Sequence, residues 1–323
     1  MVRSSDPARV PGSIRLGPIC AIPALLLAAP GHAQDLRLRL PLDCTLGETC
    51  FIQQYVDADP GPGHADFTGG PLSYDGHKGT DFRVSDLEAM ALGVPVLAPA
   101  RGTVRGTRDG MPDRIMTDRA DVADRECGNG VAISHDDGWE TQLCHLAQGS
   151  VLVDTGDAVE AGQPIGRIGL SGASQFPHVH IAVRRDGEVV DPFVEGLWLE
   201  APAYEPGGLL SAGFADGIPE YEQVKAGTAD AADLPADAPA LVLWGSVFGG
   251  RAGDVIGLTI TGPDGNEVFE QEIALERTQA ELFRAAGRRL RAERWDPGAY
   301  AGRVILMRDG QEIDRLDTQV VLR

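Results

Sequence analysis

Basic and aromatic residues are both scarce in this chain of 323 residues. Lysine and arginine together number 28 against 48 aspartates and glutamates, which gives a formal net charge of −20, and aromatic residues make up 6% of the sequence. No cluster of basic residues and no ladder of aromatic residues is present. A chain with this charge repels nucleic acid and anionic lipid. We therefore expect no nucleic-acid partner.

Long apolar runs are missing too, apart from a short one near the N-terminus. Residues 1–15 carry three arginines, residues 19–29 are almost all apolar, and residues 31–33 (Gly-His-Ala) place small residues where signal peptidase reads. This order is typical of a secretory signal peptide and is too short for a stable membrane span. We predict a signal peptide over 1–33, export to the periplasm or the medium, and no stable membrane insertion after cleavage. Cys20 lacks the small residues of a lipoprotein cleavage site, so no lipid anchor is expected.

Cysteines are few, and none of them lies in a CxxC pair. Removal of the signal peptide leaves four of the five: Cys44, Cys50, Cys127 and Cys144. A four-sulfur zinc site needs the close spacing that is absent here. An even number in an exported chain indicates two disulfides, for which the sequence permits three connectivities. We expect Cys44–Cys50, which closes a small loop, and Cys127–Cys144, which ties neighbouring segments of one sheet.

Helical periodicity is absent between residues 77 and 195. Short stretches rich in valine and isoleucine alternate there with turn signals at about every 8–12 residues, a pattern typical of an all-β sandwich or barrel. The stretches are 94–104, 130–135, 141–146, 158–168 and 178–183. The charged segment 109–126 interrupts the pattern and is expected to be an inserted surface loop with a helical turn.

The glycine-rich segment 156–166 predicts a β-hairpin similar to the one in lipoyl and biotinyl carrier domains. Those carriers need a lysine at the tip of the hairpin. No lysine occurs between Lys78 and Lys225, so the chain is not a carrier of this kind.

A second strand-rich unit follows a stretch rich in alanine, proline, glycine and acidic residues. Turn signals at 262–265 and 296–298 separate its strands, which predicts a small immunoglobulin-like β-sandwich. Only 277–294 is expected to be helical, because it has mostly good helix formers and no proline. No catalytic constellation is found here, so an accessory role is expected. The predicted segments of the whole chain are 1–33, 34–70 (an N-terminal extension), 71–200, 201–238 (a linker) and 239–323.

Histidines in two motifs are the candidates for chemistry. His178 and His180 form an HxH pair, and on a strand two residues that are two apart point to the same face. His77 and Asp81 place an imidazole and a carboxylate four residues apart, in a loop entering a strand. Either motif alone is weak, since histidines on an exposed strand face are common. His145 alone would be read as a structural histidine.

Taken together, these residues match a catalytic zinc centre. Such a centre needs three protein ligands and one open position for water, and His77, Asp81 and His180 supply a His₂Asp set. Zinc bound there would lower the pKa of its water and polarise a carbonyl. His145 and His178 remain as a general acid and base, or as donors to a developing oxyanion.

At this point the sequence resembles the lysostaphin/LytM-type zinc endopeptidases. The resemblance covers about residues 72–195. It rests on HxxxD, on a histidine followed by leucine, on HxH after a glycine-rich segment and Ser-Gly, and on the stretches 93–104, 128–131 and 177–180. It implies a catalytic antiparallel β-sheet domain over 71–200 and one zinc ion per chain. His77, Asp81 and His180 would be the zinc ligands, and His145 and His178 the non-ligand catalytic pair.

The same resemblance implies the substrate, which is a peptide bond in the stem peptides or crosslinks of peptidoglycan. Family members that only activate other wall hydrolases have lost ligands, whereas all five positions are filled here. Two alternatives stay open: a catalytically silent regulator or wall-binding module with the same fold, and a peptidase that acts on secreted proteins. The chain departs from the family at Leu143, where an aromatic residue is common. The oligomeric state is not predicted.

Overall fold

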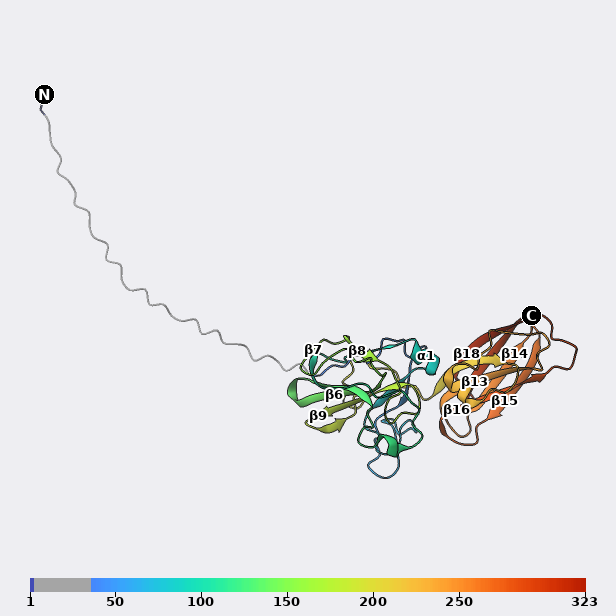
Figure 1. Cartoon of the computed structure of the whole chain (residues 1–323), viewed down its shortest axis with the longest axis horizontal. Coiled ribbons are helices and arrows are strands. Elements are labelled where there is room, and N and C mark those ends of the chain that lie inside the picture. The colour runs from blue at the N-terminus through green and yellow to red at the C-terminus, as the bar shows by residue number, and fades with distance from the viewer. Residues whose placement is uncertain (3–35) are drawn as a thin grey trace. The chain divides into compact units, whose positions relative to one another are not determined.

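The structure, a computed structural model, describes residues 1–2 and 36–323 (Figure 1). The predicted signal peptide, 1–33, lies outside the described residues except for its first two. Among the described residues no helix is both long and apolar enough to cross a membrane.

Most of the region before residue 200 folds into one antiparallel sheet, the large sheet. Its strand order is β1-β2-β9-β6-β5-β4-β7, with β10 paired to β9. Its strands are β1 (Phe51–Gln54), β2 (Thr80–Arg83), β4 (Gly102–Arg108), β5 (Asn129–Ser134), β6 (Trp139–Leu146), β7 (Ala158–Val159), β9 (His178–Arg185) and β10 (Glu188–Val190). The segment 34–70, expected to be an extension, thus contributes β1 to this sheet. The all-β prediction is confirmed.

Strand β9 shows why the sequence places its histidines together. Val179, Ile181 and Val183 are at most 1% exposed and belong to the core of this region. Because side chains alternate along a strand, His178 and His180 project from the opposite face. The apolar alternation that builds the core therefore also sets the HxH pair on one surface.

A two-stranded sheet packs beside the large one and corrects the predicted hairpin. Its strands are β3 (Pro95–Leu97) and β8 (Pro164–Arg167). The turn in 156–166 is present, but β7 pairs with β4 and β8 pairs with β3, so the two halves do not pair with each other. Strand β7 contributes Val159 to the core and strand β8 contributes Ile165, and both side chains are buried. A short helix, α1 (Leu87–Ala91), precedes β3 and is capped by the Asp86 side chain.

The segment 109–126 is a loop with one 3₁₀ turn, Arg119–Val122, as expected. A second 3₁₀ turn, Asp136–Gly138, leads into β6. Both predicted disulfides are confirmed. Cys44 pairs with Cys50, and Cys127 pairs with Cys144, which ties the end of the loop to β6.

The remaining strands form two facing sheets, here called the C-terminal sandwich. One sheet has the order β11-β13-β16 and the other β12-β18-β17-β14-β15. The strands are β11 (Gly208–Ala215), β12 (Asp233–Leu234), β13 (Ala240–Gly250), β14 (Val255–Thr261), β15 (Glu267–Ala274), β16 (Gln279–Arg289), β17 (Gly298–Arg308) and β18 (Gln311–Leu322). One core contains buried residues of both sheets, among them Leu243 of β13 and Leu258 of β14. Segment 201–238, predicted as a linker, contains β11 and the helix α2 (Tyr221–Ala226).

The helix predicted over 277–294 is wrong, because this segment forms strand β16. It pairs with β13 along almost its whole length. Leu282 and Ala286 pack on the core of the sandwich, whereas Phe283 and Ala285 pack on the opposite side, against a cluster that includes Trp244. Alternate side chains of β16 thus pack on opposite faces of the strand, and both faces are covered. Tertiary pairing therefore overrides the helical propensity of the individual residues.

Candidate functional site

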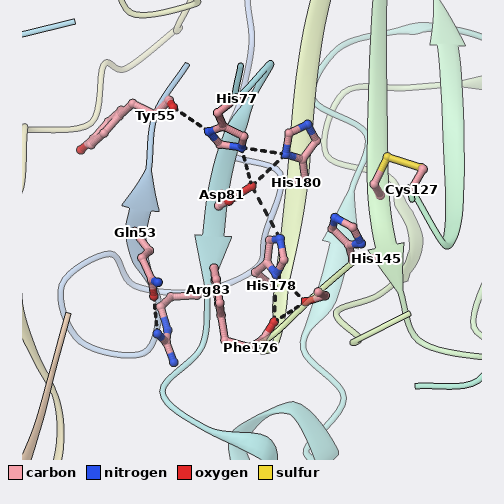
Figure 2. Close-up of polar contacts among 12 residues, drawn as sticks. Gln53, Tyr55, His77, Asp81, Arg83, Cys127, His145, Phe176, His178 and His180 are labelled. Carbon is pink, nitrogen blue, oxygen red and sulfur yellow. Dashed lines mark hydrogen bonds and ion pairs between the residues drawn. A yellow bond between two sulfur atoms is a disulfide. The ribbon is translucent and has the colours of Figure 1, made fainter. Parts of the chain in front are cut away.

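Three of the predicted site residues meet where β2 pairs with β9. The register places Asp81 directly opposite His180, and His77 lies in the loop that leads into β2. His77 Nε2 is 3.3 Å from Asp81 Oδ1 and 3.1 Å from His180 Nδ1, and His180 Nδ1 is 2.8 Å from Asp81 Oδ1. Figure 2 shows the three side chains converging on one point. They form a group of three donor atoms that could hold a metal ion.

This triangle of donor atoms fits zinc. Two ligand atoms bound tetrahedrally at about 2.0–2.1 Å lie about 3.3 Å apart, close to the separations observed. The His77 ring is already oriented, because its Nδ1–H donates to the Tyr55 carbonyl oxygen at 2.7 Å. That hydrogen bond leaves Nε2 as the unprotonated nitrogen, as a metal-bound histidine requires. The donor set and its outer hydrogen bond both suit a zinc ion.

Gly79 is required between His77 and Asp81 by a close approach. A Cβ atom at this position would lie 2.5 Å from His180 Nε2 and 2.5 Å from the Ile181 carbonyl oxygen. Ordinary contacts of this kind begin at 3.4 Å. The glycine therefore lets the loop pass against the imidazole of one candidate ligand.

Charge is concentrated on Asp81 at the centre of the site. Burial alone would raise the pKa of Asp81, but the charge of the His77 ring and hydrogen bonds from His180 and His77 outweigh burial and hold that pKa well below its usual value. Burial alone would lower the pKa of His77, but the Asp81 carboxylate outweighs it and raises that pKa. Asp81 is thus ionised at neutral pH, as an anionic metal ligand must be.

His145 and His178 form a second pair beside the triangle, with ring centroids 4.6 Å apart. The Nδ1–H of His145 donates to the Ser171 carbonyl oxygen at 2.7 Å, and that of His178 donates to the Phe176 carbonyl oxygen at 2.8 Å. Burial lowers the pKa of both rings, and His178 adds to the effect on His145, whose pKa lies well below the usual value. Both rings are therefore neutral at neutral pH, with Nε2 as the proton acceptor.

An irregularity in β6 aims His145 at the site. The β5–β6 register shifts between the pairs Asn129–Leu146 and Val131–Leu143, and His145 has a φ of 65°. A positive φ is uncommon for a residue with a side chain and is typical of a β-bulge. The bulge is fastened by the Cys127–Cys144 disulfide. Leu143, which replaces the expected aromatic residue, is fully buried in the core.

Two aromatic rings next to the histidines were not predicted from the sequence. Tyr74 stacks on His77 with ring centroids 4.3 Å apart, and Phe176 stacks on His178 at 4.4 Å. The only signal available was their position, three residues before one motif histidine and two before the other. All five predicted site residues lie together, and these rings border them.

The inserted loop 109–126 builds a cavity of about 620 Å³ near this pair. The cavity is lined by loop residues and by Gly172, which follows the serine whose carbonyl oxygen holds His145. Its lining includes three arginines, Arg108, Arg114 and Arg125, and three aspartates, Asp109, Asp118 and Asp121. Among the described residues, none of these three arginines lies within ion-pair distance of a carboxylate. The lining therefore holds three arginines that form no ion pair with the described residues, next to an equal number of aspartates.

A His₂Asp triangle with two further imidazoles beside it is the donor arrangement of a hydrolytic zinc centre. Residues 75–192 match Peptidase family M23, and this match contains all five histidine and aspartate positions. The chain therefore contains a domain of peptidase family M23, in agreement with the resemblance to the lysostaphin/LytM type.

Curated relatives share this domain. An uncharacterized metalloprotease of Haemophilus influenzae is 33% identical over 123 residues, which are 38% of this chain and 21% of that protein. The murein hydrolase activator EnvC of Escherichia coli is 32% identical over 93 residues, 28% of this chain and 22% of that protein. The peptidoglycan DD-endopeptidase ShyA of Vibrio cholerae is 35% identical over 104 residues, 32% of this chain and 19% of that protein. The chain thus spans about a fifth of the length of these relatives.

Proposed function

We propose that this protein is an exported zinc endopeptidase that hydrolyses peptide bonds in the stem peptides or crosslinks of peptidoglycan. The observation that carries this proposal is the donor triangle of His77, Asp81 and His180 next to two neutral imidazoles. The M23 domain supports it, as do relatives named a metalloprotease and a peptidoglycan DD-endopeptidase.

In this proposal His77 Nε2, Asp81 Oδ1 and His180 Nδ1 hold one zinc ion per chain. Bound zinc would supply an activated water molecule and polarise the scissile carbonyl group. The Tyr55 carbonyl oxygen keeps His77 in the tautomer that can bind metal. Gly79 keeps the space beside His180 open.

His145 and His178 move the protons. Each ring has its Nδ1–H fixed by a backbone carbonyl, so each presents an unprotonated Nε2. A nitrogen of this kind accepts a proton from the attacking water and afterwards donates one to the amine that leaves. The other neutral ring, whose Nδ1–H is also held by a backbone carbonyl, can accept a hydrogen bond from the attacking water through its own Nε2. The short distance between the rings lets both act on one peptide bond.

The cavity under the inserted loop is our proposed site for the stem peptide. Peptidoglycan stems carry free carboxylates, and Arg108, Arg114 and Arg125 offer guanidinium groups that bind carboxylates through paired hydrogen bonds. The net charge of the protein is −20, so attraction of an acidic substrate has to be local. We infer that these arginines supply it.

Export is part of the same proposal. The signal peptide predicted over 1–33 would carry the chain to the compartment that holds the wall. Two disulfides support that location, because they persist in oxidising compartments such as the periplasm.

The similarity to a hydrolase activator favours a second candidate, a regulator that keeps the fold without using the metal. Digestion of purified sacculi separates the two functions. The zinc-loaded protein should cut the crosslinks and release soluble fragments, and His77→Ala should lose both zinc and this release. His64→Ala is the matched control, since His64 is an exposed histidine outside the site. A regulator would leave sacculi intact in every case, whereas a peptidase for secreted proteins would cut unfolded casein but not sacculi.

A further inference from the structure

Arg83, at the end of β2, is the only arginine among the buried side chains of residues 36–323, and it is 1% exposed. Its Nε–H donates to the Val84 carbonyl oxygen at 3.0 Å, and one Nη donates to the Ser85 carbonyl oxygen at 3.0 Å. The other Nη donates to Gln53 Oε1 and to Glu281 Oε2, the latter at 2.9 Å. A buried guanidinium needs such partners, because desolvation of an unpaired charge is costly.

This buried group reaches the proposed catalytic pair through one aromatic ring. The β2–β9 register places Arg83 opposite His178. The guanidinium carbon lies 4.8 Å from the centre of the Phe176 ring, and that ring stacks on the His178 imidazole. The Phe176 carbonyl oxygen also accepts the Nδ1–H of His178. Figure 2 shows Gln53, Arg83, Phe176 and His178 in this order. Phe176 thus restrains His178 by its ring and by its backbone.

The acidic partner of Arg83 comes from the C-terminal sandwich. Glu281 lies on β16, and its side chain is 16% exposed, so water screens this ion pair only partly. A second contact lies close by, where Phe51 of β1 packs on Phe248 of β13 with ring centroids 5.6 Å apart. The sandwich therefore places a carboxylate against the guanidinium that supports the Phe176 ring.

We propose that Glu281, Arg83 and Phe176 are positioning residues through which the C-terminal sandwich fixes the His178 imidazole. This inference rests on the proposed peptidase function for its kinetic consequence. The C-terminal sandwich therefore helps to hold the catalytic histidine in position. Loss of the Glu281 charge removes the carboxylate partner of the guanidinium and leaves its hydrogen bonds to Val84, Ser85 and Gln53. We expect the guanidinium to hold the Phe176 ring less firmly, so that His178 can leave its productive orientation. The chain of contacts meets the proposed zinc site at His178, whose Nε2 lies 3.6 Å from Asp81 Oδ1.

The test removes the Glu281 charge without changing its shape. In Glu281→Gln, kcat on a purified crosslinked muropeptide dimer should fall by about 10- to 100-fold, the cost of misplacing a catalytic group by a fraction of an ångström to 1 Å. KM and zinc content should stay within about twofold of wild type. Glu272→Gln, the same change at an exposed glutamate of β15, is the matched control and should leave all three values unchanged.

A second readout does not depend on activity. In the NMR spectrum of ¹⁵N-histidine-labelled protein, the ring signals of His178 are assigned by their loss in His178→Ala. Glu281→Gln should shift or broaden these signals, and Glu272→Gln should not. If wild type fails to cleave the dimer, the proposed function fails, while the spectra still test the positioning. Wild-type kcat together with unmoved His178 signals in Glu281→Gln would overturn the inference.

Variants of Phe176 test the chain of contacts from its other end. They also test the positioning of His178 if Glu281→Gln does not fold. Phe176→Leu keeps an apolar side chain but removes the stacked ring, so kcat should fall with zinc content unchanged. Phe176→Tyr restores a ring and should recover most of the loss. Equal kcat values in the leucine and tyrosine variants would show that the ring does not position His178.

Discussion

Gly79→Ala is a small change with a large expected effect on zinc binding. The added methyl carbon would lie 2.5 Å from both His180 Nε2 and the Ile181 carbonyl oxygen, against 3.4 Å for an ordinary contact. The imidazole or the strand must therefore retreat by about 1 Å, whereas bonds in a zinc site tolerate only about ±0.2 Å. We expect zinc affinity to fall at least 10- to 100-fold, the usual cost of disturbing the groups that orient ligands. Overpacking should also cost about 1–3 kcal/mol of folding stability.

The assay is a zinc titration against a competing chelator, together with thermal unfolding of the zinc-free protein. Gly106→Ala on β4 is the matched control, because a Cβ atom there meets no atom within 4 Å and Gly106 does not have a positive φ. The control should bind zinc as wild type does. Wild-type zinc affinity in Gly79→Ala would refute the placement of His180 as a ligand beside this glycine.

Three further predictions concern His145, the Cys127–Cys144 disulfide and Asp66. His145→Ala should keep its zinc and lose about 10²–10⁴-fold in rate, measured on one preparation by elemental analysis and muropeptide release. The double variant Cys127→Ser/Cys144→Ser should lose about 2–4 kcal/mol of folding stability and therefore unfold at a lower temperature. It should also lose activity, because the disulfide holds the β-bulge at His145 in place; unchanged activity would contradict this. Burial would raise the pKa of Asp66, but hydrogen bonds from Thr68 and other donors outweigh it and lower that pKa. Its stabilising effect is therefore present above about pH 4 and is lost as pH falls further, so the stability deficit of Asp66→Asn in urea unfolding should shrink below about pH 4.

The site could be predicted from the sequence where strand geometry fixes it. His178 and His180 are two residues apart on a strand, so the period of two sets them on one face without knowledge of the tertiary fold. The sequence predicted that His77 and Asp81 lie where a loop enters a strand, but the pairing of that strand with β9, which sets Asp81 opposite His180, is seen only in the structure. Local patterns of this kind carry the all-β class and the HxH pair, whereas the role of His145 came from the resemblance to the lysostaphin/LytM type.

Features that depend on distant pairing could not be read from the sequence. Nothing near Arg83 indicates that its carboxylate partner lies 198 residues away on another sheet. The same limit explains the wrong helix at 277–294, since Ala, Glu and Arg favour a helix until β13 offers a strand to pair with. The segment 156–166 has the glycines of a hairpin, yet its two strands pair with β4 and β3. In each case long-range burial decided the outcome.

One digestion tests the central proposal most directly. Purified sacculi are incubated with zinc-loaded protein and, in parallel, with His180→Ala, and the muropeptides are then separated and weighed by mass spectrometry. The proposed function predicts that crosslinked dimers disappear, that fragments with one new amine and one new carboxylate per cut bond appear, and that His180→Ala yields neither. An unchanged muropeptide pattern with fully zinc-loaded, folded protein would contradict it.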